Sequence, residues 1–254
     1  MTIVRAAAAA LAFALASGAS AAVVIEGKEG DKTQRFVMDG KKLRLESGEG
    51  SEAMIFDAAT QRSIQLDPAT KTYTEFKKED LDKLQAMMKE RGGPKKVRTT
   101  KYEKTGKTDT ALGKSCDVYR VVESDAEADD TEQTLCLAPF GTFGVNREDF
   151  APFRAFGEFA SQLSGGEVER SWADVPGIPV IAWEKEDGQR KETFRATKVE
   201  RRSVPATAFE VPAGWKKGPS VGEQMRDMQQ QMPPEVQEQM QQRTREQMKH
   251  QGAK

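Results

Sequence analysis

Apolar and polar residues alternate along short segments for much of this chain, and turn-forming residues separate the segments. Such alternation is typical of half-buried β-strands. Asp39-Gly40 and Asp67-Pro68-Ala69-Thr70 are turn sequences, because Gly tolerates a positive φ and Asp can accept hydrogen bonds from the turn backbone. The pattern predicts an antiparallel meander with strands at 35–38, 41–46, 52–57, 62–66 and 71–76.

Two later segments have the period of a helix. In the first, over residues 78–91, one face carries Leu81, Leu84 and Met88, and Gly92-Gly93-Pro94 follows as a stop signal. Asn146 or Asp149 can cap the second, which runs to Leu163. Its wide apolar face is mostly aromatic and consists of Phe150, Phe153, Phe156, Phe159 and Leu163. We therefore predict two helices, the second with an unusually aromatic face.

The alternating pattern resumes around these helices. It predicts strands at 97–104, 116–122, 132–138, 179–186 and 191–200. Asp187-Gly188 predicts a two-residue turn between the last two strands. That turn would place Ile181 opposite Phe194 and Glu184 opposite Lys191.

The chain contains only two cysteines, Cys116 and Cys136, and each lies in a predicted strand. We predict that they form a structural disulfide, since the chain lacks a C-x-x-C redox motif. If the two cysteines face each other across a hairpin, Arg120 lies opposite Glu132. The same arrangement would gather Tyr119, Val121, Leu135 and Leu137 on the other face.

The first 22 residues have the pattern of a secretory signal peptide. Arg5 is their only charged residue, the apolar run 6–16 follows it, and the small residues 19–22 provide cleavage sites near Ala21-Ala22. We expect the mature chain to be periplasmic or secreted. No later stretch has the roughly 20 apolar residues of a spanning helix, so we expect no transmembrane segment in the mature chain.

The composition and the absence of known motifs argue against several classes of function. The chain has 39 Lys and Arg against 40 Asp and Glu, which gives no net positive field for nucleic acid. Its one histidine, His250, lies near the C-terminus, and the sequence lacks the Ser-hydrolase, dinucleotide-binding and P-loop motifs. We expect no enzyme activity, no cofactor, no metal site and no nucleic-acid partner.

Charge and composition also shift along the chain. Residues 89–107 carry eight Lys or Arg and two Glu, while residues 123–132 carry six acidic and no basic residues. The basic run could contact anionic lipid headgroups, but solvated loop faces explain both runs better. After Gly218 the chain is rich in Gln, Met and charge. We predict a folded domain over 23–217 and a flexible or partly helical tail over 218–254.

The order of these elements resembles the lipoprotein-carrier (LolA-like) superfamily, and within it a bacterial family of unknown function. The resemblance rests on a series of strand-and-turn segments between residues 35 and 215, which are Asp39–Leu45, Ile55–Asp57, Leu66–Phe76, Ala111–Val121 and Phe209–Trp215. It implies an α+β fold in which an antiparallel β half-barrel wraps over two helices, with the polar tail outside it. It also implies an envelope protein with a hydrophobic concavity.

This resemblance gives the aromatic helix two interpretations. Its five apolar side chains, from Phe150 to Leu163, could line a groove that accepts an acyl chain, or they could fill the core beneath the sheet. We expect a non-enzymatic protein that binds a hydrophobic small molecule, a lipid or a lipoprotein in this groove. The alternative is an envelope interaction or sensing module that binds a protein partner through the charged loops and residues 220–254.

Overall fold

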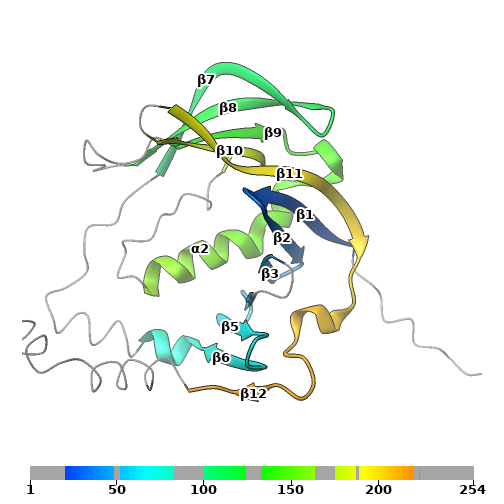
Figure 1. Ribbon diagram of the computed structural model, residues 1–254, viewed down its shortest axis with the longest axis vertical. Helices are drawn as coiled ribbons and strands as arrows, with labels where there is room; N and C mark the ends of the chain where they lie inside the picture. The colour runs from blue at the N-terminus through cyan, green and yellow to red at the C-terminus, as the bar shows by residue number, and fades with distance from the viewer. Residues whose placement is uncertain are drawn as a thin grey trace, which may run out of the picture.

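The computed structural model describes residues 21–48, 52–82, 100–123, 133–163, 175–186, 189–219 and 223. These residues form one large open sheet that curves around a single long helix (Figure 1). The strand order across the sheet is β12-β6-β5-β4-β3-β2-β1-β11-β10-β9-β8-β7. Neighbouring strands are antiparallel, except that β12 pairs with β6 in parallel. The predicted open antiparallel architecture is thus confirmed.

Twelve strands make up this sheet. They are β1 (Ala21–Glu29), β2 (Lys32–Asp39), β3 (Lys42–Ser47), β4 (Ala53–Asp57), β5 (Arg62–Asp67), β6 (Thr72–Phe76), β7 (Thr100–Ala111), β8 (Lys114–Glu123), β9 (Gln133–Ala138), β10 (Ile178–Glu186), β11 (Gln189–Ser203) and β12 (Lys216–Lys217). Strands β2 to β6 are the predicted meander. At its β5–β6 turn, Asp67 Oδ1 accepts a 2.9 Å hydrogen bond from the Ala69 amide, as the turn sequence predicts.

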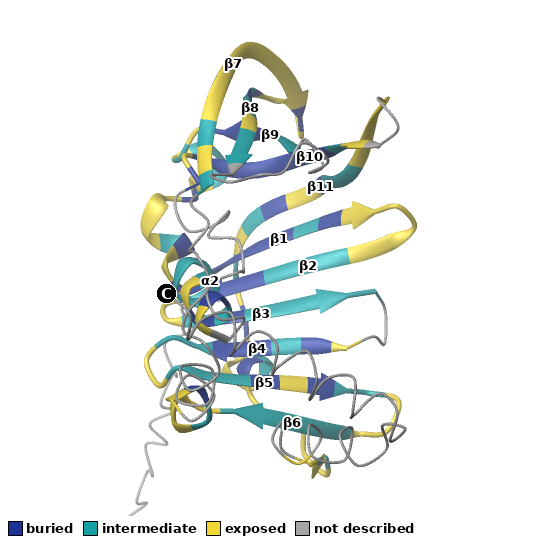
Figure 2. Cartoon of the chain, turned by 90° about the vertical axis from the view of Figure 1, so that its left-hand side faces the viewer, coloured by how far each residue is buried: buried dark blue, intermediate teal, exposed yellow. Residues whose placement is uncertain are grey.

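Strand β1 is absent from the sequence prediction, yet it lies at the centre of the sheet between β2 and β11. Its side chains are buried on both faces (Figure 2). Val23 and Ile25 belong to the core that faces the helix, whereas Ala22 and Val24 belong to a second core on the opposite face. A strand buried on both sides has no alternating pattern, which is why its sequence resembles a continuation of the apolar leader.

The aromatic helix begins with a 3₁₀ turn, η2 (Arg147–Phe150), and continues as α2 (Ala151–Leu163). At the start of η2, the Asp149 carboxylate accepts a 2.7 Å hydrogen bond from the backbone N–H of Asn146. Arg201 of β11 forms an ion pair with Asp149 and donates a 2.6 Å hydrogen bond to the Gly144 carbonyl. These contacts fix the N-terminal end of the helix to β11.

The other predicted helix is described only in part. Residues 78–82 are helical, and the rest of its predicted range, 83–91, lies outside the described residues. Leu81 is 1% exposed and joins the core that faces α2. The signal peptide residues 1–20, the Asp187-Gly188 turn, Glu132 and nearly all of the tail also lie outside the described residues. Those predictions therefore stay predictions.

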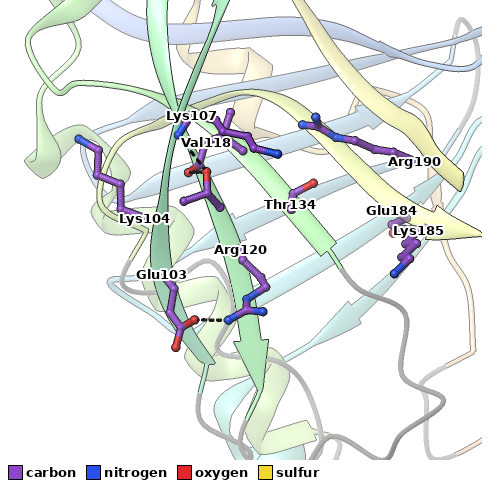
Figure 3. A pocket seen from close by; sticks show the side chains of 10 residues that line it. Glu103, Lys104, Lys107, Val118, Arg120, Thr134, Glu184, Lys185 and Arg190 are labelled. Carbon is purple, nitrogen blue, oxygen red and sulfur yellow. Dashed lines mark hydrogen bonds and ion pairs between the residues drawn. The ribbon is translucent and has the colours of Figure 1, made fainter. Parts of the chain in front are cut away.

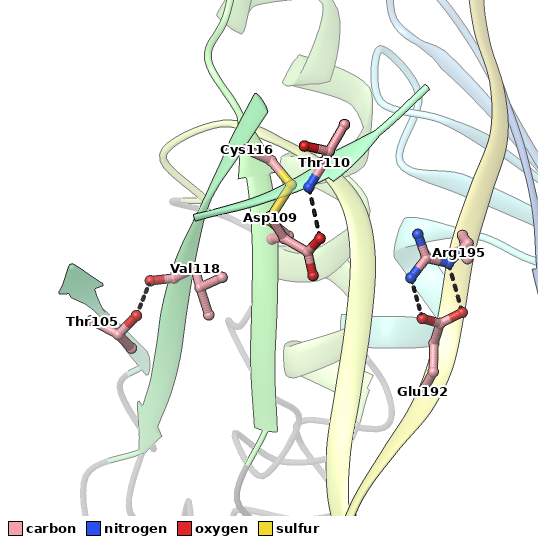
Figure 4. Close-up of a disulfide and its surroundings, with 8 residues drawn as sticks. Thr105, Asp109, Thr110, Cys116, Val118, Glu192 and Arg195 are labelled. Atoms are coloured by element: carbon pink, nitrogen blue, oxygen red, sulfur yellow. Dashed lines mark hydrogen bonds and ion pairs between the residues drawn. A yellow bond between two sulfur atoms is a disulfide. The ribbon is translucent and has the colours of Figure 1, made fainter. Parts of the chain in front are cut away.

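The disulfide between Cys116 and Cys136 is confirmed, and its Cα atoms lie 5.4 Å apart (Figure 4). The predicted register is wrong by two residues, since Val118 lies opposite Cys136 and Arg120 lies opposite Thr134. A disulfide can span this diagonal because strand neighbours two residues apart share a face. Since the shift is even, Tyr119, Val121, Leu135 and Leu137 still cluster together, as predicted.

Arg120 also has a different partner from the one predicted. Its guanidinium pairs at 2.6 Å with Glu103 of β7, so the ion pair bridges β8 and β7.

The β10–β11 hairpin follows its predicted register only near the turn. Glu184 lies opposite Lys191, as predicted, but Phe194 lies opposite Ala182, so its predicted pairing with Ile181 is wrong. A register shift between the Ala182 and Trp183 pairs inserts one extra residue into β11. This bulge decides which face of the sheet carries the Phe194 ring.

The segment after β11 covers the face of β1–β6 that points away from α2. Its 3₁₀ turn, η3 (Ala206–Phe209), brings Phe209 against the core that contains Val24 and Ile55. The segment ends as β12 beside β6, where Lys217 Nζ donates a 2.8 Å hydrogen bond to Glu75. The β1–β6 half of the sheet is thus covered by α2 on one face and by the C-terminal end of the domain on the other.

Candidate hydrophobic groove

A groove of about 490 Å³ lies between α2 and the face of the sheet that α2 covers. Strands β1, β2, β3, β10 and β11 contribute most of its sheet wall. The apolar side chains of that wall are Ile25, Phe36, Met38, Leu45, Pro179, Ala182 and Phe194. The helix contributes Phe150, Phe153, Phe156, Gly157 and Ala160. This volume is within the roughly 300–1,000 Å³ of typical small-molecule sites.

The structure divides the aromatic face of α2 between core and groove. Phe159 is 2% exposed and belongs to the core, and it does not line the groove. Phe150, the last residue of η2, is 3% exposed and belongs to the core, but it also lines the groove. Phe153 and Phe156 are only partly buried, and both line the groove. Leu163 is the last residue of α2, and its side chain lies outside the described part of the structure. The groove candidates therefore share one helix but not one role.

Ring-to-ring contacts hold α2 against the sheet. The Phe56 centroid lies 5.5 Å from that of Phe156 and 5.2 Å from that of Phe159. Phe76 meets Phe159 edge to face at 5.8 Å. In the first turn of α2, the Phe153 centroid lies 6.2 Å from that of Phe36. Since edge-to-face pairs favour defined geometries, these contacts fix the rotation of α2 and thus the width of the groove.

None of the predicted groove residues lies on the sheet, and the aromatic residues of the sheet wall are Phe36 and Phe194. Their ring centroids lie 6.0 Å apart, with the planes nearly perpendicular. Gly27 of β1 makes room for the Phe194 ring, because a Cβ on Gly27 would approach that ring to 2.3 Å. A glycine within a strand often marks such a close approach, so Gly27 was the available signal.

Gly157 leaves the helix side of the groove open. It occupies the middle of α2, where glycine is about 1 kcal/mol less favourable than alanine. A Cβ at this position would meet no heavy atom within 4 Å, so packing does not require glycine here. The missing side chain leaves space in the groove itself.

The polar residues along the groove are acidic or neutral. They are Glu29, Gln34, Gln133, Glu184 and Thr193. Gln34 Nε2 donates a 2.7 Å hydrogen bond to Glu29, which holds this part of the rim in place. Among the described residues that line the groove there is no Lys, Arg or His. The rim thus carries negative charge and amide groups around an aromatic interior.

The described residues contain no group of three or more His, Cys, Asp or Glu side chains arranged to hold a metal ion. Within the same part of the chain, no helix combines the length and apolar character needed to cross a membrane. What the groove offers chemically is apolar burial for an elongated ligand, with hydrogen-bonding groups at its rim.

The fold and its groove define a class of protein, an open antiparallel sheet wrapped around an aromatic helix that leaves an apolar groove between them. The chain belongs to the family described as Domain of unknown function (DUF4412), which it matches over residues 22–215. A search of curated proteins found no match to the chain.

Among solved structures, the chain is similar to one of PNGF-II, with a TM-score of 0.38 and 8% sequence identity. The match covers 80% of this chain and 32% of the PNGF-II chain, so this chain spans about a third of that protein. A likeness this low assigns neither a fold family nor a function.

Proposed function

We propose that this protein is an exported, non-enzymatic envelope protein that binds the acyl chain of a lipid or an acylated protein in the α2 groove. The proposal includes the fold, which we assign as a LolA-like half-barrel formed by the sheet and the helix. The observation that carries the proposal is the groove itself, in which Phe153 and Phe156 of α2 face Phe36 and Phe194 of the sheet. A domain with no ligand would gain stability by closing such a space.

The groove supplies affinity by apolar burial. Transfer of a methylene group from water into an apolar site contributes about 0.8 kcal/mol. Ten methylenes would contribute about 8 kcal/mol, before the loss of translational and conformational freedom is subtracted. Polar groups such as Gln34 and Gln133 would remain at the rim to contact the head of the ligand. No chemical step is needed for such a carrier.

Export rests on the signal-peptide pattern and agrees with the position of β1. Ala22 is 1% exposed and packs with Val24 and Val37. Cleavage after Ala21 would keep Ala22 in the central strand, whereas cleavage after Ala22 would remove it. We therefore expect the mature chain to begin at Ala22, which the intact mass of the protein recovered from a periplasmic extract would show.

Ligand binding is tested on the mature protein in two ways. Native mass spectrometry of protein purified without detergent should show a co-purified species of lipid mass, and chloroform extraction should remove it. The extracted protein should then raise the fluorescence of the neutral probe N-phenyl-1-naphthylamine, and an added lipid extract should reverse the rise. A clean mass for the purified chain together with no probe binding would overturn the proposal.

A further inference from the structure

A second pocket, of about 450 Å³, lies on the other side of the sheet from the groove. It lies against the faces of β8 and β9 that carry Val118 and Thr134. Alternate residues of a strand point to opposite faces, so Tyr119 and Leu135 are on the side of the groove. The hairpin strands β7 and β8 and the neighbouring strands β10 and β11 contribute the other walls (Figure 3).

A bulge in β7 shapes this pocket. Lys104 pairs with Tyr119 and Thr108 pairs with Asp117, so three residues of β7 lie opposite the single residue Val118. Gly106 within the bulge has a φ of 77°, which glycine adopts without strain. The Thr105 hydroxyl donates a 2.8 Å hydrogen bond to the Val118 carbonyl in place of a regular ladder bond. Bulges of this kind redirect side chains, and this one carries Lys107 into the pocket wall.

The pocket is lined by more positive than negative side chains. Its charged residues are Lys104, Lys107, Arg120, Lys185 and Arg190, against Glu103 and Glu184. Two of the cations have carboxylate partners within hydrogen-bond distance. Arg120 pairs with Glu103 at 2.6 Å, and Lys104 pairs with Asp117 at 2.8 Å. The hydrogen bond to Asp117 raises the pKa of Lys104, which therefore stays charged at neutral pH.

Lys107 and Arg190 are different. Within the described part of the chain, neither side chain has a carboxylate partner, and Figure 3 shows the two side chains extending toward one another. The Arg190 guanidinium lies over the Trp183 ring, with Cζ 3.4 Å from the ring centroid. Stacking orients a guanidinium while leaving the N–H groups at its edge available to an acceptor. Two converging cations repel each other unless an anion lies between them.

We propose that this pocket binds an anion that carries a phosphoryl group, and that Lys107 and Arg190 are the principal residues that contact this group. A phosphoryl group carries about −1.5 to −2 charges at neutral pH and has several acceptor oxygens, so one group can satisfy both cations. The planar edge of Arg190 matches two such oxygens, while Lys107 supplies a point charge. The Thr134 hydroxyl lies in the same wall and offers a further donor. Neither Lys107 nor Arg190 lines the groove, so failure of either proposal leaves the other intact.

The test uses inorganic pyrophosphate as the probe and isothermal titration calorimetry as the readout. Lys107→Gln combined with Arg190→Gln should weaken pyrophosphate binding at least tenfold. The matched control combines Lys114→Gln with Lys216→Gln, which removes the same charge at exposed positions outside the pocket and should change affinity less than threefold. Binding to the unmodified protein should also change Trp183 fluorescence, and Arg190→Gln should abolish that change.

A vesicle experiment identifies the source of the phosphoryl group. If it belongs to a lipid headgroup, phosphatidylglycerol vesicles should cosediment the protein, phosphatidylcholine vesicles should not, and the pocket variant should stay in solution. If it belongs to a free small anion, pyrophosphate should bind and neither vesicle should. The proposal is overturned if the unmodified protein binds neither probe, or if the control variant loses as much affinity as the pocket variant.

Discussion

Gly157 provides the sharpest residue-level test of the groove. A side chain at this position would start in open space and extend into the groove. We predict that Gly157→Phe abolishes N-phenyl-1-naphthylamine binding while the melting temperature stays equal or rises, since replacing glycine within a helix removes a conformational cost. Fluorescence titration and differential scanning calorimetry would measure the two effects.

Gly157→Ala is the matched control. It should give a similar or larger stability gain, because alanine is the best helix former, while a single methyl group should leave most of the groove open. If Gly157→Phe binds the probe as well as Gly157→Ala does, the groove beside α2 is not the binding site.

Titration of Glu75 should make the free energy of unfolding depend on pH. Burial raises the pKa of its carboxyl, but hydrogen bonds from Lys217 and Arg62 outweigh burial, so its pKa lies below the ordinary value. A carboxyl with a lowered folded-state pKa stabilises the fold at pH values above its unfolded pKa of about 4.5, and loses that contribution as the pH falls through the folded value.

Glu75→Gln should therefore lower the free energy of unfolding most near pH 7. The deficit in unfolding free energy relative to the unmodified protein should shrink as the pH falls below about 4.5. Urea unfolding of both proteins at pH 7, 5, 4 and 3 would measure this. Glu210→Gln, at an exposed position of the same C-terminal segment, is the control and should show a small deficit at every pH. A Glu75→Gln deficit that stays constant across the series would contradict the role of this carboxylate in attaching β12 to β6.

The sequence predicts much of the site, but not the role of each residue. The spacing of phenylalanines from 150 to 159 predicts one aromatic helix face, and α2 has that face. Spacing cannot show that Phe159 lies between Phe56 and Phe76, because both partners come from distant strands. Phe194 is hidden for a similar reason, since the bulge in β11 places its ring against Gly27.

At the scale of the element, α2 combines a core function and a groove function in different turns. We predict that Phe159→Ala lowers the free energy of unfolding by about 3–5 kcal/mol, because that ring is 2% exposed and its removal would leave a cavity in the core. Phe153→Ala should lower the free energy of unfolding by clearly less, and it should weaken probe binding. Urea unfolding and probe titration would separate the two, and equal stability losses would contradict this division of the helix.

The β8–β9 pair depends on its disulfide. The bond closes a loop of 20 residues, for which the loss of chain entropy in the unfolded state is worth about 3 kcal/mol. Replacing Cys116 and Cys136 together by alanine should lower the free energy of unfolding by about that amount. Reduced and oxidised forms of the unmodified protein should differ similarly in urea unfolding. A loss below about 1 kcal/mol in both comparisons would show that the hairpin is held by its packing instead.

Strand elements differ in how well the sequence reveals them. The meander from β2 to β6 is predictable because its strands are short and turn residues such as Asp39-Gly40 and Asp67-Pro68 separate them, although β2 and β4 are buried on both faces. Strand β1 lacks alternation because both of its faces are buried. The predicted register of β8–β9 is wrong because it places the two cysteines directly opposite each other, whereas the disulfide is diagonal.

At the scale of the whole molecule, one sheet presents two chemically different sites on its two faces. The groove is aromatic with an acidic rim, and the second pocket is cationic. Glu184 of β10 lines both, so the two sites meet at the end of this strand. A phosphoryl group on an acyl ligand would find no cation at the groove rim among the described residues, whereas the second pocket offers several. Under the two proposals, the two faces would bind different chemical groups.

This division predicts which head group the groove accepts. Three single-chain amphiphiles of similar chain length carry heads of different charge, namely dodecyltrimethylammonium, dodecyl maltoside and dodecanoate. With Glu29 and Glu184 on the rim, dodecanoate should displace N-phenyl-1-naphthylamine at least threefold less well than the other two at pH 7.5 and low salt. Added salt should narrow the gap, because both carboxylates are accessible to solvent ions.

Glu29→Gln tests the cause of this preference, because it removes one rim charge and leaves the aromatic wall unchanged. The variant should bind dodecanoate more tightly, while its affinity for dodecyl maltoside should stay the same. If dodecanoate binds the unmodified protein as tightly as the neutral amphiphile, the acidic rim does not select the head group, and only the acyl chain is recognised. If none of the three displaces the probe, the groove is not an acyl-chain site, and the failure lies with the proposed function rather than with the charge of its rim.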